Sequence, residues 1–251
     1  MGGVPATVCA VGGTLCEGPV WVARERALWF VDIKQRQVYR FDPEGGFTPL
    51  ATVEADRPDN RLNDAVTDPK GRIWFGSMDD TERQTTGDYY RFEKGEVSHA
   101  GLPSVGITNG PALSPDGRIL YSVDTLGGLI HASDVGEDGR LGGARLFARI
   151  TPDEGYPDGP TVDSEGCLWI GLFAGWQARR YAPDGTLLES VKFPVGNITK
   201  LAFGGDDLRT VFATTARLHL KAEDLELQPE AGNLFTFRAD VAGVPVTPVA
   251  L

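Results

Sequence analysis

Cysteine and histidine are scarce in this sequence, with three of each among 251 residues. The cysteines, Cys9, Cys16 and Cys167, are odd in number and lack the spacing of metal ligands. They argue against a disulfide framework and predict small, buried, reduced side chains in a cytoplasmic protein. The histidines share no position in the internal repeat described below, so neither a histidine zinc cluster nor a Ser-His-Asp arrangement is expected.

Positive charge and long hydrophobic runs are also lacking. Lys and Arg number 24 against 35 Asp and Glu, which gives a formal net charge of -11 at pH 7. A nucleic-acid-binding surface needs the opposite sign, so nucleic acid is not an expected partner. No apolar run is long enough to cross a bilayer, so no membrane partner is expected. The first residues, MGGVPATVCAVGG, lack the basic start and apolar stretch of a secretory signal.

Sustained helical periodicity is missing as well, apart from one or two turns near Ala222–Leu227. Instead, 32 glycines and 17 prolines are spread along the whole chain. This composition is typical of many short strands joined by turns. The sequence therefore predicts an all-β fold, in one domain that covers residues 1–251.

A strand-like motif recurs five times in the chain. The motifs are ERALWFVD, KGRIWFGS, DGRILYSVD, EGCLWIGL and LRTVFATT, anchored by Trp29, Trp74, Leu120, Trp169 and Val211. The anchors are spaced roughly 45 residues apart, a period typical of four-stranded propeller blades. We therefore predict a β-propeller of five four-stranded blades. The final segment, LFTFRADVAGVPVTPVAL, is expected to form two strands that close the ring together with Ala6–Ala10.

One side chain able to bind a ligand or ion precedes each anchor by eleven or twelve positions. These residues are Glu17, Asn63, Asn109, Asp158 and Lys200. Equivalent positions at the inner ends of propeller blades converge on the axis, so we expect the five side chains to meet there. A single Asn-Gly or Asp-Gly pair usually marks a turn. Four oxygen-bearing side chains at one repeat position, however, indicate a binding site.

The motifs around these positions resemble those of the SMP-30/gluconolactonase/regucalcin-like family. The strings that carry the resemblance are CEGPVW, RLNDAVTDPKGRIWFGSM, ITNGPALSPDGRILYSVDT, YPDGPTVDSEGCLWIGLF, NITKLAFGGDDLRTVFATTAR and PEAGNLF. Together they cover nearly the whole chain in the family's order. The greatest similarity is to bacterial sugar lactonases of the xylonolactonase type, which have similar ITNGP, YPDG and NITK-like strings.

The resemblance implies a propeller with a divalent metal ion on its axis. Matched position by position, Glu17, Asn109 and Asp158 correspond to the metal ligands of the family. Asp158 also corresponds to the residue proposed there as general base. Arg61 and Asn63, from the RxND motif, correspond to the family's substrate-binding residues.

The predicted function is metal-dependent hydrolysis of a sugar lactone, an aldonolactone, to the open-chain acid. Oxygen ligands suit Ca²⁺, Mg²⁺ or Mn²⁺, with Fe²⁺ and Zn²⁺ as alternatives. We expect the ion to polarise the lactone carbonyl and Asp158 to activate water. Lys200 is expected to support the developing oxyanion or attract the acidic product. Alternatives are hydrolysis of other lactones or organophosphates, and a metal-binding propeller with little or no catalysis.

The chain departs from the family pattern in two places. The family normally has six blades, whereas a stretch of roughly 40 residues, about one blade, is missing here between FDPEGGFTPL and EADRPDNRLND. The ring then either closes with five blades as a monomer or stays open, with a blade edge that pairs with a second chain. The second departure concerns an acidic substrate contact of the family, which falls here on Thr81, between Asp80 and Glu82.

Several other residues receive structural interpretations. Asp64 is interpreted as a turn or blade-bracing residue. The tryptophans interpreted as blade-packing residues are Trp21, Trp29, Trp74 and Trp169. Trp176 lies in an FAGW loop, and this loop is expected to reach the mouth of the pocket.

Overall fold

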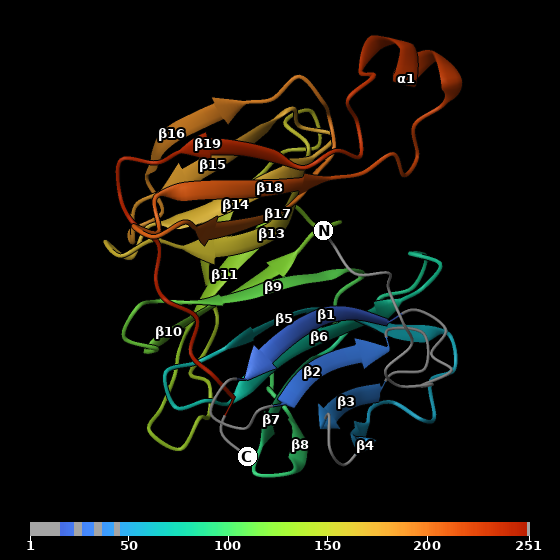
Figure 1. Ribbon diagram of the computed structural model, residues 1–251, viewed down its shortest axis with the longest axis vertical. Helices are drawn as coiled ribbons and strands as arrows, with labels where there is room; N and C mark the ends of the chain where they lie inside the picture. Colours follow the sequence, from blue (N-terminus) through green and yellow to red (C-terminus); the bar gives the residue numbers. More distant parts are fainter. Residues whose placement is uncertain (1–15, 23–26, 33–36, 43–45, 250–251) are drawn as a thin grey trace, which may run out of the picture.

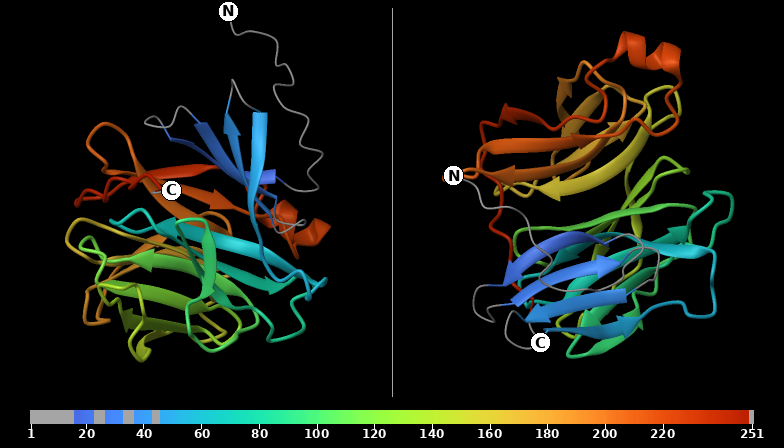
Figure 2. Two further views of the ribbon diagram at one scale, coloured as in Figure 1. Left: turned by 90° about the horizontal axis from the view of Figure 1, so that it is seen from below. Right: turned by 45° about the vertical axis from the view of Figure 1, so that its right-hand side comes forward.

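The structure is a computed structural model that describes residues 16–22, 27–32, 37–42 and 46–249, with side chains described at 37, 39–42 and 50–249. The described residues form antiparallel sheets arranged as the blades of a propeller (Figure 1; Figure 2). Four of these sheets have four strands and one has three. The predicted fold class, an all-β propeller, is confirmed.

Within each sheet the strands follow one another in chain order. The first sheet contains β1 (Cys16–Val22), β2 (Ala27–Asp32), β3 (Gln37–Asp42) and β4 (Gly46–Thr52). The second contains β5 (Asn60–Thr67), β6 (Ile73–Asp79), β7 (Tyr89–Glu93) and β8 (Glu96–His99). The third contains β9 (Thr108–Leu113), β10 (Ile119–Asp124), β11 (Leu129–Asp134) and β12 (Arg145–Arg149).

The fourth sheet contains β13 (Tyr156–Val162), β14 (Leu168–Phe173), β15 (Gln177–Tyr181) and β16 (Leu187–Lys192). The last sheet contains β17 (Ile198–Gly204), β18 (Thr210–Thr215) and β19 (Phe235–Arg238). The short helix α1 (Ala222–Leu227) lies between β18 and β19, where the sequence predicted one or two helical turns.

The predicted count of five four-stranded blades is not confirmed, because the last sheet has three strands among the described residues. The terminal segment supplies one strand to this sheet and not the predicted two. Prolines in its GVPVTP stretch lack the N–H group that a strand ladder needs. The stretch instead runs as a tail. Gly243 forms an isolated β-bridge with Asp163, and the Val249 side chain is buried against the second sheet. The expected closing strand at Ala6–Ala10 lies outside the described residues.

The inner strands of four sheets, β5, β9, β13 and β17, lie in a row side by side (Figure 1). In the part of the chain that the structure describes, β1 makes far fewer contacts with β5 and β17 than the four inner strands make with one another. The strand β1 therefore does not extend this row. The row of four inner strands therefore forms the part of the propeller centre whose side chains the structure describes.

The repeat anchors are confirmed as packing centres of their sheets. Those with described side chains lie on the second strand of a sheet and are at most 1% exposed: Trp74, Leu120, Trp169 and Val211. The indole N–H groups of Trp74 and Trp169 donate to buried aspartates, Asp68 and Asp163, at 3.0 Å. Cys167 is buried and free, as predicted. The side chains of Cys9, Cys16, Trp21 and Trp29 lie outside the described ones.

An irregularity in strand pairing recurs in the inner strand of every sheet. The register shifts beside Glu17 in β1, Leu62 in β5, Asn109 in β9, Asp158 in β13 and Lys200 in β17. Such a β-bulge bends the strand and redirects the side chains next to it. The bulges therefore fall at the repeat position of the predicted site, which explains how that position turns toward the centre.

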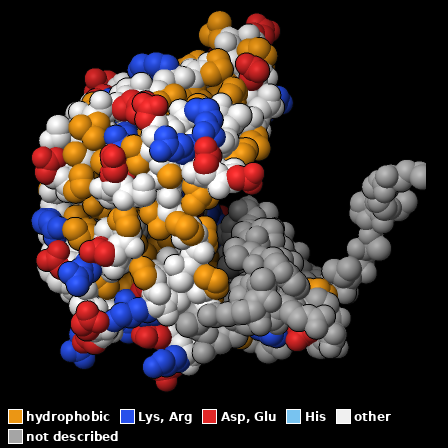
Figure 3. Space-filling model, turned by 60° about the vertical axis from the view of Figure 1, so that its left-hand side comes forward, with side chains coloured by type: hydrophobic (Ala, Val, Ile, Leu, Met, Phe, Trp, Pro, Cys, Tyr) orange, Lys and Arg blue, Asp and Glu red, His pale blue; other side chains and the backbone are white. Residues whose placement is uncertain are grey.

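The surface view in Figure 3 shows Lys, Arg, Asp and Glu scattered over one face, with hydrophobic side chains between them. Neither sign of charge gathers into one large patch on this face. Among the described residues, the helical segments are too short and too polar to span a bilayer.

Candidate functional site

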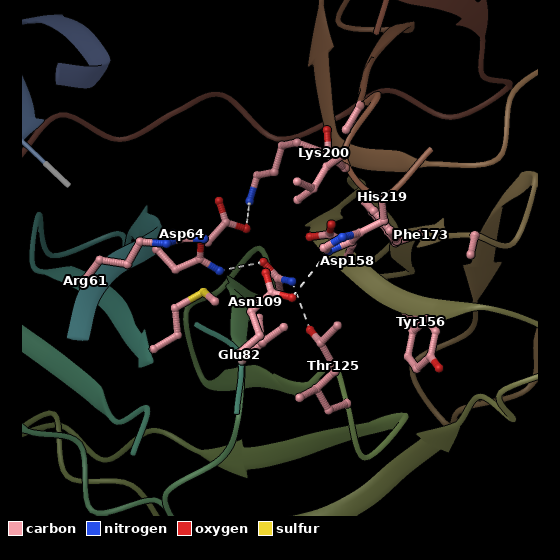
Figure 4. Close-up of a pocket in the computed structure, with 18 residues that line it drawn as sticks. Arg61, Asp64, Glu82, Asn109, Thr125, Tyr156, Asp158, Phe173, Lys200 and His219 are labelled. Carbon is pink, nitrogen blue, oxygen red and sulfur yellow. Dashed lines mark hydrogen bonds and ion pairs between the residues drawn. The ribbon is translucent and has the colours of Figure 1, made fainter. Parts of the chain in front are cut away.

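A cavity of about 600 Å³ lies where the inner strands meet. Four of the five repeat residues line it, namely Asn63, Asn109, Asp158 and Lys200 (Figure 4). Arg61 lines it too. The structure therefore brings together every predicted site residue whose side chain it describes. The fifth repeat residue, Glu17, lies on β1, and its side chain is outside the described ones.

A chain of hydrogen bonds runs through the cavity wall. Arg61 Nη1 donates to the Asn63 amide oxygen at 2.9 Å, and Asn63 Nδ2 donates to the Asn109 amide oxygen at 2.9 Å. Asn109 Nδ2 in turn donates to Thr125 Oγ1 at 2.9 Å, and that hydroxyl donates to the Pro157 carbonyl at 3.0 Å. This series of hydrogen bonds links three sheets. It also determines which atom of each asparagine amide accepts a hydrogen bond and which atom donates one.

Asp64 has a larger role than the turn or brace that the sequence suggested. It does brace two blades, because its carboxylate accepts the Gly110 N–H at 3.1 Å. It also lines the cavity and accepts the Lys200 ammonium group at 2.6 Å (Figure 4). Lys200 therefore reaches from β17 toward β5, and its positive charge is held between the two strands.

Asp158 is a partly buried carboxylate on β13 in the same cavity. Burial raises its pKa well above the usual range, and repulsion from the Asp64 carboxylate adds to the shift. Attraction to Lys200 and Arg61 and a hydrogen bond from the Gly159 N–H act in the opposite direction. A carboxylate with a raised pKa is a stronger proton acceptor than an ordinary aspartate, which suits a general base.

Several oxygens that line the cavity are of the type that hard divalent cations prefer. They comprise the carboxylates of Asp64 and Asp158 and the amide oxygens of Asn63 and Asn109. A cation among them would offset the repulsion between the two carboxylates. Among the described side chains no three from Asp, Glu, His or Cys gather closely enough to hold an ion. The oxygen atoms of the cavity thus fit a divalent metal ion. A third carboxylate, in addition to those of Asp64 and Asp158, would have to come from a residue such as Glu17.

One acidic side chain and one histidine of the cavity, Glu82 and His219, have no role predicted from the sequence. Both line the cavity, and His219 Nε2 lies 3.5 Å from Glu82 Oε2. Their φ angles, 59° and 64°, are in the left-handed region that few non-glycine residues adopt. The only sequence feature that pointed to Glu82 was its place beside Thr81, and no sequence feature pointed to His219. They come from loops after β6 and β18, so only folding brings them together.

The FAGW loop reaches the cavity, as expected. Phe173 and Ala174 of this loop line the cavity, whereas Trp176 is not among the described lining residues. The Trp176 side chain is 42% exposed, and the backbone N–H of Trp176 donates to the Gly196 carbonyl at 3.1 Å. The φ angles of Ala174 and Trp176, 59° and 57°, are in the left-handed region.

Tyr89 supports the cavity wall from behind. Its buried hydroxyl lies 2.8 Å from the carbonyls of Asn109 and Val123 and accepts the Val123 N–H at 2.9 Å. Burial raises the pKa of Tyr89, so the hydroxyl stays protonated at ordinary pH.

Replacing Tyr89 by phenylalanine is expected to lower the free energy of unfolding by about 1–3 kcal/mol, because a buried N–H and two carbonyls lose a partner. Urea unfolding measures this change. Tyr156→Phe is the control, since the Tyr156 hydroxyl makes no hydrogen bond to the described residues and its loss should change stability by less than about 0.5 kcal/mol. Equal stability of the two variants would contradict the assigned support.

The chain matches the protein family described as SMP-30/Gluconolactonase/LRE-like region over residues 15–48 and 43–217. The two matched stretches overlap at residues 43–48, close to the place where the sequence pattern predicted that about one blade is missing. Together they cover well over half of the chain.

Two curated relatives are lactonases by name. The 6-deoxy-6-sulfogluconolactonase of Pseudomonas putida is 30% identical over 269 residues, with 91% of this chain and 92% of the relative covered. The L-arabinolactonase of Azospirillum brasilense is 30% identical over 274 residues, with 92% and 90% covered. Both alignments are longer than this chain of 251 residues, so parts of these relatives have no counterpart here.

A crystal structure of regucalcin from Agrobacterium tumefaciens, described as a calcium-binding protein, has a similar fold. It matches with a TM-score of 0.79 and 26% sequence identity, and 94% of each chain is covered. The regucalcin of Oryctolagus cuniculus is 30% identical to this chain over 277 residues, with 91% of this chain and 92% of the relative covered.

Proposed function

Because the chain belongs to the SMP-30/gluconolactonase/LRE-like family, we propose that it is a metal-dependent lactonase that opens a cyclic ester to the hydroxy acid. The observation that carries this proposal is the gathering of Arg61, Asn63, Asn109 and Asp158 in one cavity. The names of the relatives, 6-deoxy-6-sulfogluconolactonase and L-arabinolactonase, favour a sugar lactone as the parent class of substrate.

Asp158 is the proposed general base. It takes a proton from water while the water oxygen attacks the carbonyl carbon of the lactone. The bond between that carbon and the ring oxygen then breaks, and Asp158 returns the proton to the ring oxygen. One ester and one water thus become one carboxylic acid and one hydroxyl group.

Arg61 and Asn63 are proposed to bind oxygen atoms of the substrate, since both line the cavity and guanidinium and amide groups form directional hydrogen bonds. Lys200 is proposed to stabilise the negative charge that develops on the carbonyl oxygen. Its ion pair with Asp64 at 2.6 Å supports this role, because the ammonium group is held in place before a substrate binds.

Glu17, Asn109 and Asp158 are the proposed ligands of one divalent ion. When bound, the ion would supply Lewis-acid polarisation of the lactone carbonyl. Calcium is the first ion to test, because the regucalcin structure of similar fold is described as calcium-binding and carboxylate and amide oxygens suit this ion. Mg²⁺, Mn²⁺, Fe²⁺ and Zn²⁺ complete the set.

Removal of divalent ions is expected to lower the rate of lactone hydrolysis about a hundredfold or more, because carbonyl polarisation contributes several kcal/mol. Proton release from a panel of aldonolactones measures the rate before chelation, after chelation and after each ion is added back. Chelator already saturated with the same ion is the control. Full activity of protein shown by elemental analysis to be metal-free would contradict the metal dependence.

The alternative is a metal-binding propeller with little or no catalysis. One observation favours it: in the described part of the chain, the row of inner strands does not extend to β1. We nevertheless propose that residues 1–251 form a single monomeric domain in which the first sheet completes the ring and brings Glu17 to the site. Metal binding without lactone opening above the rate in buffer would establish the alternative.

A further inference from the structure

The cavity has a second repeated feature, which consists of apolar side chains. Each comes from the end of the second strand of a sheet or from the loop that follows it. We call this set the apolar collar, and it comprises Met78, Leu126, Phe173 and Leu218. The repeat residues Asn63, Asn109, Asp158 and Lys200 come from the first strands. Each of the four sheets therefore contributes one polar side chain from its first strand and one apolar side chain from its second strand or the loop after it.

Two members of the apolar collar are not explained by core packing. Leu126 is 48% exposed and Leu218 is 56% exposed, yet both line the cavity. A single exposed leucine is ordinary in a soluble protein. Two exposed leucines from different sheets that line one cavity, together with the Phe173 ring, form a surface suited to an apolar ligand group.

The polar groups of the cavity are largely engaged with one another. Asn63 and Asn109 are joined in the hydrogen-bond chain, Lys200 is paired with Asp64, and the carboxylate of Glu82 lies near His219. Figure 4 shows Phe173 on the opposite side of the cavity from Arg61. A ligand that spans the cavity therefore meets Arg61 at one end and, at the other, the Phe173 ring, whose centroid lies 6.2 Å from that of His219.

We propose that the preferred substrate is a lactone that carries an apolar substituent, alkyl or aryl, and not an unmodified polyhydroxylated sugar lactone. This inference rests on the proposed lactonase function. The ester of the ring lies at Asp158, and the substituent lies against Leu126, Phe173 and Leu218. A cavity of about 600 Å³ has room for both parts.

The test compares δ-valerolactone, its butyl-substituted homologue and gluconolactone, with full-length protein in the presence of its divalent ion. Burial of one methylene group is worth about fourfold in binding. Since the collar is partly open to solvent, we expect kcat/KM for the butyl lactone to exceed that for δ-valerolactone and for gluconolactone by about tenfold or more. A rate on gluconolactone equal to or above that on the butyl lactone would overturn the inference and leave the lactonase function intact.

Leu218→Asn tests the collar directly, with Leu146→Asn as a matched control. Leu218 and Leu146 are 56% and 55% exposed, but Leu146 lies on the outer strand β12, away from the cavity. We expect Leu218→Asn to raise KM for the butyl lactone about threefold to tenfold and to have a much smaller effect with δ-valerolactone. Equal effects of the two substitutions would overturn the assignment.

If none of the lactones opens faster than in buffer, the proposed lactonase function fails, and binding still tests the collar. The probes are then the two lactams that correspond to δ-valerolactone and its butyl homologue, measured by titration calorimetry. Binding of the butyl lactam about tenfold tighter, weakened by Leu218→Asn and unchanged by Leu146→Asn, would support the collar. Equal binding of the two lactams would overturn it.

Discussion

Replacing Asp158 by asparagine is expected to lower kcat/KM for lactone hydrolysis about a thousandfold, because a positioned general base contributes between about a hundredfold and ten thousandfold. Asparagine is nearly the same size as aspartate but cannot accept the proton of the attacking water. The same change removes a carboxylate from the proposed metal site. Initial rates of proton release, with the divalent ion in excess, measure the loss.

The stability of this variant distinguishes a chemical effect from unfolding. The pKa of Asp158 is raised in the folded protein, first by burial and then by Asp64. Ionisation of such a carboxyl therefore destabilises the fold as pH rises from the unfolded pKa through the folded one. Asparagine does not ionise, so without added metal the variant should be at least as stable as the original protein near neutral pH.

Asp153→Asn is the matched control, since Asp153 precedes the same strand by a few residues and is exposed. The chemical change is identical and should leave the rate within about twofold. An Asp158→Asn variant that keeps more than a tenth of the activity would exclude Asp158 as the general base.

The largest expected loss of stability follows from Asp163→Ala. Asp163 is fully buried and accepts the Trp169 indole N–H at 3.0 Å and Arg180 Nε at 2.8 Å. It also accepts the backbone N–H groups of Glu165 and Cys167 at 3.0 Å. Removing the carboxylate leaves the mostly buried Arg180 guanidinium, the Trp169 indole N–H and two backbone N–H groups without this acceptor. We expect the free energy of unfolding to fall by about 3–5 kcal/mol.

Denaturant unfolding of Asp163→Ala and Asp207→Ala, side by side, checks this expectation. Asp207 also pairs with an arginine, Arg238, at 2.6 Å, but these side chains are 51% and 59% exposed. Water screens such a pair, so its loss should be worth no more than about 1 kcal/mol. If Asp163→Ala does not fold, Asp163→Asn, which keeps the shape and part of the hydrogen bonding, provides the measurement. A loss no larger than that of Asp207→Ala would refute the role of Asp163.

The buried aspartate is also a repeated device. Asp68 stands six residues before Trp74, as Asp163 stands six residues before Trp169, and each accepts the indole N–H of its tryptophan. Each aspartate is also paired with an arginine, Arg72 or Arg180. The tryptophan anchors are thus fixed at both their apolar and their polar atoms, which keeps the second strands in place behind the cavity.

Much of the fold was predictable from the sequence because propeller repeats are local. The spacing of the anchors fixes which strand is the second of each sheet, and Trp74, Leu120, Trp169 and Val211 are all found there, buried. The strand count of the last sheet was not predictable in the same way. The GVPVTP stretch alternates like a strand, but its prolines cannot complete a ladder, and the tail instead packs against other sheets.

The candidate site, like the fold, was predictable from the sequence only in part. The sequence by itself determined that Asn63, Asn109, Asp158 and Lys200 share one cavity, because one repeat position occupies one place in every blade and a bulge turns it toward the centre. Only the tertiary structure decided what each residue meets across the cavity. The Lys200–Asp64 pair and the approach of Glu82 to His219 join residues more than a hundred positions apart. Such contacts depend on loop conformation and side-chain reach, which no repeat period encodes.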